Sequence, residues 1–211
     1  MRKFGFAAAL MLAGITVAEA QPISATTYTY YTISGDSAVE LYQSMIRRGP
    51  HVNGAKAYAS TGFSTLPPSG KLVQGKSCRI VGFRQSLKFV IRLPKFNSAA
   101  GLAADTRSRW NAFSSFVRKH EETHRAIWTN CAQGLESKVS AIRAPDCKSA
   151  ETRALRLWAE MRQSCQRRHD AFDAAEQKRL VRHPFVQLAL AGAGQSSRGA
   201  VIRKSKKKRR A

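Results

Sequence analysis

Acidic residues are scarce in this chain, and so are long apolar segments. The sequence contains 13 aspartates and glutamates against 36 lysines and arginines, which gives a formal net charge of +23. After residue 20 no stretch approaches the roughly 20 apolar residues that span a bilayer, so we expect no transmembrane segment in the mature protein. The four cysteines form no CxxC pair, which disfavours a zinc site built from cysteines. No internal repeat is present, so the sequence favours one domain with a tail.

The first twenty residues have the pattern of a secretory signal peptide. Arg2 and Lys3 precede an apolar run over residues 4–17, and the small residues Ala18 and Ala20 follow. We therefore expect export to the periplasm or the extracellular space, with residues 1–20 removed.

The cysteines fit this compartment, because an even number in an oxidising environment predicts two disulfides. The candidates are Cys78, Cys131, Cys147 and Cys165. If Cys147 and Cys165 share one helix, they lie about 27 Å apart and cannot pair. The other connectivities stay open.

The C-terminal segment is strongly basic. Residues 183–211 become rich in glycine, serine and alanine and then end in a run of lysines and arginines over residues 203–210. We expect a disordered, solvated tail, with anionic lipid or an anionic cell-envelope polymer as its possible partner.

The N-terminal half of the mature chain, residues 21–96, is predicted to be rich in β-strands. The strands are expected at residues 27–34, 71–83 and 87–93, where β-branched and aromatic residues are dense. Ser37 is the predicted N-cap of one short helix over residues 38–48. Because Pro94 follows the last strand, we expect that strand to lie at a sheet edge.

The second half, residues 105–182, is predicted to be helical. Apolar residues recur every three or four positions from about 106 to 143, with Asp105 as the expected N-cap. Asp146 is the expected cap of a second helix that ends near Leu180. The fold class is therefore α+β, with a small, mostly antiparallel sheet packed on a long αα-hairpin.

The first long helix contains an HExxH motif, His120-Glu121-Glu122-Thr123-His124. Residues four apart on a helix point in similar directions, so both imidazoles can reach one ion, and neutral imidazole is a good zinc ligand. Glu121 lies beside them and can act as general base toward water. The motif predicts one Zn²⁺ per chain in a zincin-like domain over residues 21–182. The alternative is that both histidines are structural residues on a charged helix.

A catalytic zinc site needs a third protein ligand. If the two helices fold back on each other near residues 144–145, His120 lies opposite His169, and His124 lies opposite Cys165. His169, Asp173 and Glu176 share roughly one helical face. Any of these three can complete the site, and the choice stays open.

Several segments of the chain resemble one bacterial family, that of the predicted secreted zinc-dependent proteases, an HExxH-containing domain of unknown function. The resemblance extends over about residues 28–182 and includes Tyr30-Tyr31-Thr-Ile-Ser-Gly35, Arg47-Arg48-Gly49-Pro50, Gly75-Lys76-Ser77-Cys78, the HEETH segment and Phe172-Asp173. It implies zinc binding at His120 and His124, and export. Many members continue as Tyr-Asp-x-x-Thr-x-His-Gly, whereas this chain has Lys178 where that histidine stands. The departure leaves His169, Asp173 and Glu176 as alternatives.

Two functional hypotheses follow from these patterns. The first is an exported zinc metallopeptidase of the zincin type, in which Glu121 activates water and a peptide or protein is the substrate. The strand at residues 87–93 is our candidate for the strand beside which the substrate binds. Cleavage of amide bonds in peptidoglycan stems uses the same chemistry. The second is a non-catalytic, metal-containing envelope protein that binds anionic polymer or lipid through its basic surface.

Overall fold

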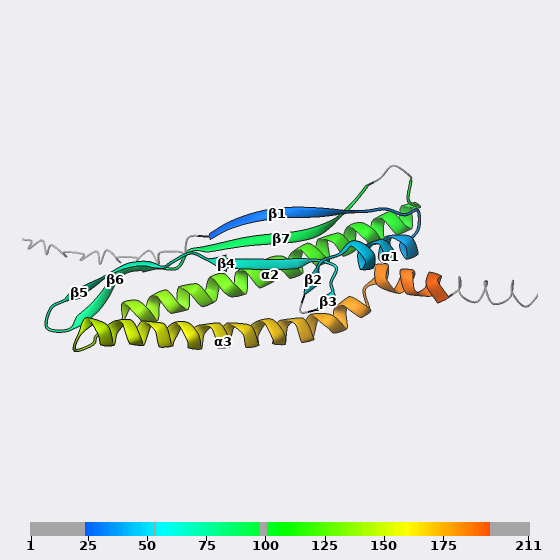
Figure 1. Cartoon of the computed structure of the whole chain (residues 1–211). Helices are drawn as coiled ribbons and strands as arrows, with labels where there is room; N and C mark the ends of the chain where they lie inside the picture. Colours follow the sequence, from blue (N-terminus) through cyan, green and yellow to red (C-terminus); the bar gives the residue numbers. More distant parts are fainter. Residues whose placement is uncertain (1–23, 53, 98–100, 195–211) are drawn as a thin grey trace, which may run out of the picture.

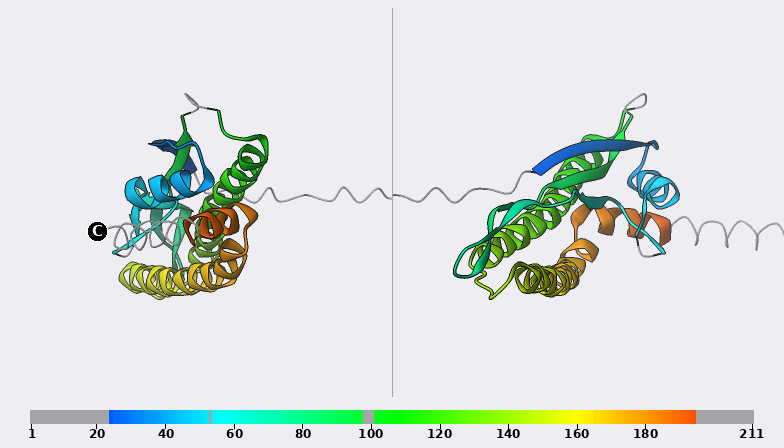
Figure 2. Two further views of the ribbon diagram at one scale, coloured as in Figure 1. Left: turned by 90° about the vertical axis from the view of Figure 1, so that its right-hand side faces the viewer. Right: turned by 60° about the vertical axis from the view of Figure 1, so that its left-hand side comes forward.

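The computed structural model describes residues 24–52, 54–97 and 101–194, and it shows an elongated α+β architecture (Figure 1). A three-stranded sheet lies along a hairpin of two long helices, α2 (Ala104–Ser140) and α3 (Cys147–Val181). The strand order is β1-β7-β4, formed by Ser24–Ile33, Leu87–Phe96 and Ser60–Thr65. Views from other directions show the sheet and the hairpin as separate layers (Figure 2). The expected αα-hairpin behind a sheet is thus present.

The three-stranded sheet is mixed, whereas the two smaller two-stranded sheets described below are antiparallel, as expected for most of the strands. β1 runs parallel to β7, and β4 runs antiparallel to it. From Leu87 to Leu93 the side chains of β7 alternate, with Leu87, Phe89 and Ile91 buried and the residues between them exposed. Phe89 packs with Trp128 of α2 and joins the sheet to the helical layer.

β7 is the central strand, so the expectation that residues 87–93 form an edge strand is wrong. Pro94 does not end the strand, which continues to Phe96. The proline is accommodated because β4 stops pairing at Arg92. Beyond that point β7 has one hydrogen-bonded neighbour, β1, and a residue without an N–H is tolerated on the open side. The edges of this sheet are therefore β1 and β4.

The short helix α1 (Ala38–Arg48) lies where the sequence predicts it. The hydroxyl of Ser37 accepts a hydrogen bond from the backbone N–H of Glu40, and the helix ends before Gly49. A Cβ at Gly49 would lie 2.3 Å from the backbone oxygen of Ala57. This close approach holds the chain that leaves β2 (His51–Val52) and β3 (Ala55–Lys56) against the end of α1.

A second hairpin projects at the far end of the molecule, formed by β5 (Ser69–Gln74) and β6 (Cys78–Arg84). A single strand over residues 71–83 was therefore a wrong prediction, since a turn at residues 75–77 divides it. Backbone hydrogen bonds between Cys78 and Ala144 attach this hairpin to the loop after α2, and the disulfide Cys78–Cys147 attaches it to the first residue of α3.

The caps of the two long helices differ in origin. Asp146 caps α3 as expected, accepting from the N–H of Ser149 at 2.8 Å. Asp105 does not cap α2, which starts after Ala103 without a side-chain cap. Asp105 instead lies in the first turn and forms an ion pair with Arg109. An acidic residue there is favourable to the helix dipole without capping.

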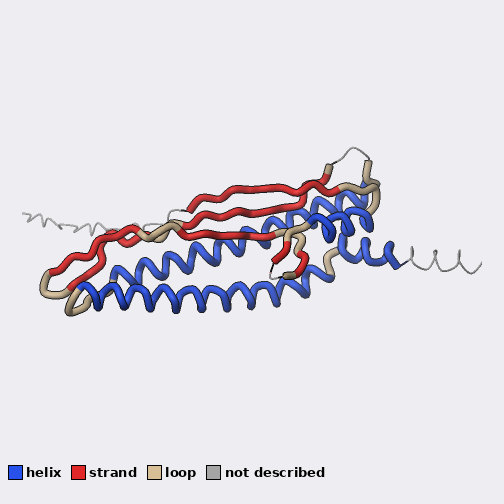
Figure 3. Tube along the Cα trace, viewed as in Figure 1, coloured by secondary structure: helices blue, strands red, loops and turns tan. Residues whose placement is uncertain are grey.

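Residues 184–194 form a further helical segment, visible after the break that follows α3 (Figure 3). The expected tail from residue 183 is therefore wrong in its first part. Phe185, Val186 and Ala189 are buried in the core beside Trp110 and Phe113. The sequence of this segment contains enough apolar residues at helical spacing to cover the core. The basic run at 203–210 and the expected signal peptide lie outside the described residues.

Within the described part of the chain, no helix is long and apolar enough to cross a membrane. All four cysteines are paired, as Cys78–Cys147 and Cys131–Cys165. The two predicted disulfides are thus confirmed, and Cys147 does not pair with Cys165. The two disulfides are consistent with an exported protein.

Candidate metal centre

Two turns in the middle of α2 place His120 and His124 side by side toward α3. Their Nε2 atoms lie 3.1 Å apart. Phe172 of α3 stacks on the His120 ring at 4.8 Å between centroids and meets the His124 ring edge-on at 5.2 Å. As helical geometry predicts, the HExxH spacing brings the two imidazoles together, and an aromatic ring from the second helix fixes the orientation of both.

Asp173 of α3 completes a compact triangle of donor atoms. Its Oδ1 lies 3.3 Å from Nε2 of His120 and 3.0 Å from Nε2 of His124. A zinc ion with bonds of about 2.0–2.1 Å in tetrahedral geometry holds its ligand atoms about 3.3–3.4 Å apart. The three atoms thus fit one face of such a site after shifts of a few tenths of an ångström.

The protonation states suit a metal ligand set. Burial lowers the pKa of His120 and the pKa of His124 below the usual value, although the carboxylate of Asp173 opposes the effect. Both imidazoles are therefore neutral near pH 7, the form that coordinates metals. The Asp173 side chain is about half exposed, so the centre is open to solvent on that side.

His169 meets His124 on the opposite side of its ring. The two Nδ1 atoms lie 2.7 Å apart, and the rings stack at 5.0 Å. Burial, followed by the neighbouring His124, lowers the pKa of His169 to about 4. A neutral His169 can accept the Nδ1 proton of His124, which leaves the Nε2 lone pair of His124 directed at the triangle.

Glu176 occupies the corresponding place beside His120. Its Oε2 lies 4.0 Å from Nδ1 of His120, and its Oε1 accepts a hydrogen bond from Arg179. Of the three alternatives for a third ligand, only Asp173 reaches both Nε2 atoms. His169 and Glu176 contact the outer nitrogens, where partners of metal-bound histidines are commonly found.

Glu121 is buried, with 5% of its surface exposed, and faces the sheet. The Thr61 hydroxyl of β4 lies 2.7 Å from its Oε2 and 3.0 Å from its backbone oxygen. Burial raises the pKa of Glu121 to about 7, with a smaller opposing effect from the Thr61 hydrogen bond. A carboxyl group with this pKa can both accept and return a proton near neutral pH.

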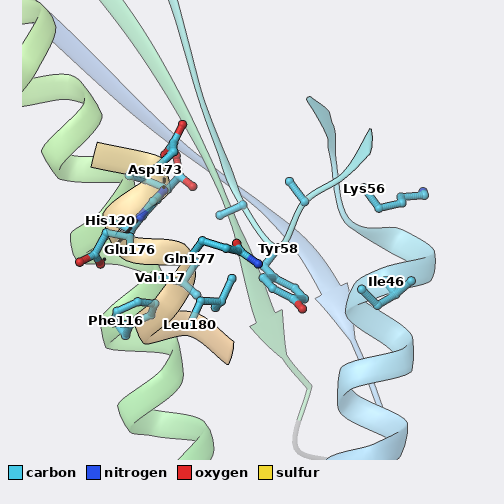
Figure 4. A pocket seen from close by; sticks show the side chains of 13 residues that line it. Ile46, Lys56, Tyr58, Phe116, Val117, His120, Asp173, Glu176, Gln177 and Leu180 are labelled. Carbon is cyan, nitrogen blue, oxygen red and sulfur yellow. Dashed lines mark ion pairs between the residues drawn. The ribbon is translucent and has the colours of Figure 1, made fainter. Parts of the chain in front are cut away.

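Two cavities meet at this centre, and His120, Glu121 and Asp173 line both of them. The first, of about 320 Å³, extends past Tyr58, Phe116 and Leu180 (Figure 4). The second, of about 330 Å³, extends along Thr61 and Phe63 of β4 toward Trp128. Phe63 and Trp128 form an aromatic wall, with their ring centroids 3.9 Å apart. The centre thus lies in a cleft between α2, α3 and the edge strand β4.

The helix register differs by about one turn from the one expected. His120 lies opposite Asp173 rather than His169, and His124 lies opposite His169 rather than Cys165. Cys165 instead pairs with Cys131. Backbone hydrogen bonds between Ala144 and Cys78 attach the loop at residues 141–146 to β6, and the disulfide Cys131–Cys165 links the two helices in the observed register.

Sequence reasoning also missed several residues of the cleft. Thr61, Tyr58 and the short segment around Ala57 come from a region without a distinctive motif. Phe172 belongs to a segment that resembles the family, but the sequence did not indicate that its ring contacts His120 and His124. Phe172 precedes the candidate ligand Asp173 on the helix expected to face the HExxH motif, and this position is the signal that could have indicated its contact with the two histidines.

Comparison with known proteins adds one finding. A family model described as "Bacterial protein of unknown function (DUF922)" matches residues 28–180, which include every residue of the centre described above. No match was found among curated proteins or among solved structures.

Proposed function

We propose that this chain, which belongs to the DUF922 family of bacterial proteins, is an exported zinc-dependent hydrolase that cleaves peptide bonds. The observation that supports this most is the convergence of Nε2 of His120, Nε2 of His124 and Oδ1 of Asp173 within 3.3 Å of one another. Three protein donors with space beside them are typical of catalytic zinc sites, whereas structural sites have four.

Zinc held by these three residues would lower the pKa of a coordinated water to about 7 and polarise a carbonyl group. Glu121 takes the proton from the attacking water and returns it to the leaving amine. Thr61 orients the Glu121 carboxylate through its hydroxyl. His169 keeps the proton of His124 on Nδ1, and Glu176 attracts the corresponding proton of His120.

The shape of the cleft favours an extended substrate. β4 pairs only with β7 within the described sheet, so its other edge is free. Ser60, Thr61 and Phe63 of this strand line the second cavity. A peptide can add to a free strand edge through main-chain hydrogen bonds, which would bring its carbonyl groups past Glu121. We therefore propose β4 as the strand beside which the substrate binds, in place of residues 87–93, which lie in the centre of the sheet.

The test combines metal content with peptide hydrolysis in matched glutamate variants of the mature protein. Glu121→Gln should retain about one zinc per chain and lose roughly 10²- to 10⁴-fold in hydrolysis of fluorogenic peptides. Glu122→Gln is the control, because Glu122 accepts a hydrogen bond from Tyr28 of β1 and lines neither cavity at the centre. The proposal is wrong if Glu121→Gln hydrolyses peptides at the wild-type rate, or if the zinc-loaded wild type cleaves none.

A second outcome would favour the non-catalytic alternative. If the purified wild type holds zinc with four protein ligands, the centre is a structural metal site. If it takes up no zinc at neutral pH, the two histidines serve the structure of the protein without a metal. The basic surface would then be the functional part.

A further inference from the structure

A groove lined by basic residues lies at the β1 edge of the sheet, opposite the β4 edge that borders the metal centre. It lies between β1, the end of β7 and the first half of α2, and its volume is about 510 Å³. We call it the basic groove and define it by Tyr30, Lys95, Arg107, Asn111, Ser114 and Arg118, which line it with apolar neighbours. It shares no residue with the two cavities at the metal centre.

The charge of the basic groove has one sign. Lys95, Arg107 and Arg118 line it, and none of the described lining residues is acidic. Of the carboxylates nearby on α2, Asp105 pairs with Arg109, and Glu122 accepts a hydrogen bond from Tyr28 while its charge also acts on Arg118. Even with Glu122 beside Arg118, the groove carries a net positive charge that attracts an anion.

The spacing of the cations favours an extended anion over a small one. Arg107 and Arg118 are separated by eleven residues of α2, which corresponds to about 16 Å. Asn111 and Ser114 lie between them on the same side of the helix. A single phosphate cannot contact both ends. A chain with repeating negative charges and hydroxyl groups between them can.

Tyr30 adds a flat surface between the cations. Half of its surface is exposed. Lys95 Nζ lies 5.9 Å from the centre of its ring, and Arg118 donates a hydrogen bond to its hydroxyl at 3.3 Å. An exposed aromatic face beside cations can stack on a sugar ring while the cations meet its carboxylate. The apolar residues of the groove, such as Leu93 and Trp110, are buried, so it offers little that would insert into lipid.

We propose that the basic groove binds an acidic polysaccharide, with its carboxylates at Lys95, Arg107 and Arg118 and a sugar ring on Tyr30. The site is independent of the proposed hydrolase activity. It would hold the protein on an anionic glycan while the cleft on the other edge of the sheet remains free.

The test uses the full mature chain and oligogalacturonate, a polymer of uronic acids, as the probe in a titration at physiological salt. The variant Lys95→Gln/Arg107→Gln/Arg118→Gln should bind about 10- to 100-fold more weakly, because each exposed ion pair contributes up to about fivefold. The control variant Lys138→Gln/Arg156→Gln/Arg162→Gln removes the same charge at exposed positions outside the groove and should bind like the wild type.

Two further variants separate stacking and catalysis from charge. Tyr30→Ala should weaken binding roughly 2- to 10-fold, whereas Tyr30→Phe should retain the stacking contribution. His120→Ala should bind the glycan like the wild type even if it loses zinc, so failure of the hydrolase proposal leaves this one intact. Circular dichroism and thermal melting check that each variant is folded.

The proposal is overturned if both triple variants lose affinity equally, because binding would then reflect overall charge. It is also overturned if polyglutamate or a DNA oligomer of equal charge binds as tightly as the glycan and loses as much from the groove substitutions, or if Tyr30→Ala has no effect.

Discussion

Replacing Asp173 with asparagine should weaken zinc binding by about two to three orders of magnitude. Structural zinc sites with four ligands have binding free energies of about 10–16 kcal/mol, which is roughly 2.5–4 kcal/mol per ligand. Since 1.4 kcal/mol corresponds to tenfold, losing one anionic donor predicts the stated range. Asp173 Oδ1 lies within 3.3 Å of both histidine Nε2 atoms, so no neighbouring group replaces it without moving α3.

Two other substitutions make the measurement decisive. His169→Phe removes the partner of His124 Nδ1 but leaves the triangle of donors, and partners of this kind contribute about 10- to 100-fold in metal affinity. Asp170→Asn changes an exposed carboxylate on the same helix that bonds to Gln166 and acts on His169 only through its charge, so it should have the smallest effect. The expected order of loss is therefore Asp173, then His169, then Asp170.

The assay is competition for zinc against a chromophoric chelator at fixed pH and ionic strength. If His169→Phe costs more affinity than Asp173→Asn, His169 is the third ligand and the assignment above is wrong. If neither substitution matters, the two histidines of α2 do not form a zinc centre with α3.

Three further predictions concern stability. Gly49→Ala should destabilise the fold measurably, because its Cβ would lie 2.3 Å from a backbone oxygen. Gly134→Ala, in open space within α2, should instead stabilise the fold by about 0.5–1 kcal/mol. Urea unfolding of the two variants measures both changes in stability. Replacing Cys131 and Cys165 by alanine removes a disulfide that closes a loop of 34 residues and should lower the free energy of unfolding by about 4 kcal/mol. It should also weaken zinc binding, because α2 and α3 are then less firmly held in register. In metal-free protein the folded-state pKa of His169 is about 4, below the value of about 6.5 for an unfolded chain. The folded state then binds fewer protons, so stability is complete above pH 6.5 and declines as the pH falls toward 4; His169→Gln should flatten this decline in urea midpoints measured from pH 7.5 to 4.5, and an unchanged slope would contradict it.

Local patterns were sufficient for much of the helical half. Ser37 and Asp146 cap helices where their side chains and the following apolar periodicity predict. The spacing of His120 and His124 requires only that residues 117–124 be helical, because four residues make about one turn. The prediction of one strand over residues 71–83 failed at the turn over residues 75–77. Gly75 is the only residue of that turn that strongly disfavours a continuous strand.

The sequence by itself determined that His120 and His124 share one helical face beside Glu121, that two long helices form a hairpin, and that the four cysteines can form two disulfides. All of these depend on contacts within a few turns, or on composition. Tertiary structure decided that Asp173 faces the histidines, that β4 is the edge beside Glu121, and that residues 184–194 join the core. The first depends on the register of α3 against α2, across which Cys131 and Cys165 form a disulfide. The second depends on the pairing of β4 with β7, and the third on the packing of Phe185 against Phe113. A contact such as Thr61–Glu121, between residues 60 positions apart, leaves no periodic trace in the sequence, so it becomes visible only when the chain is folded.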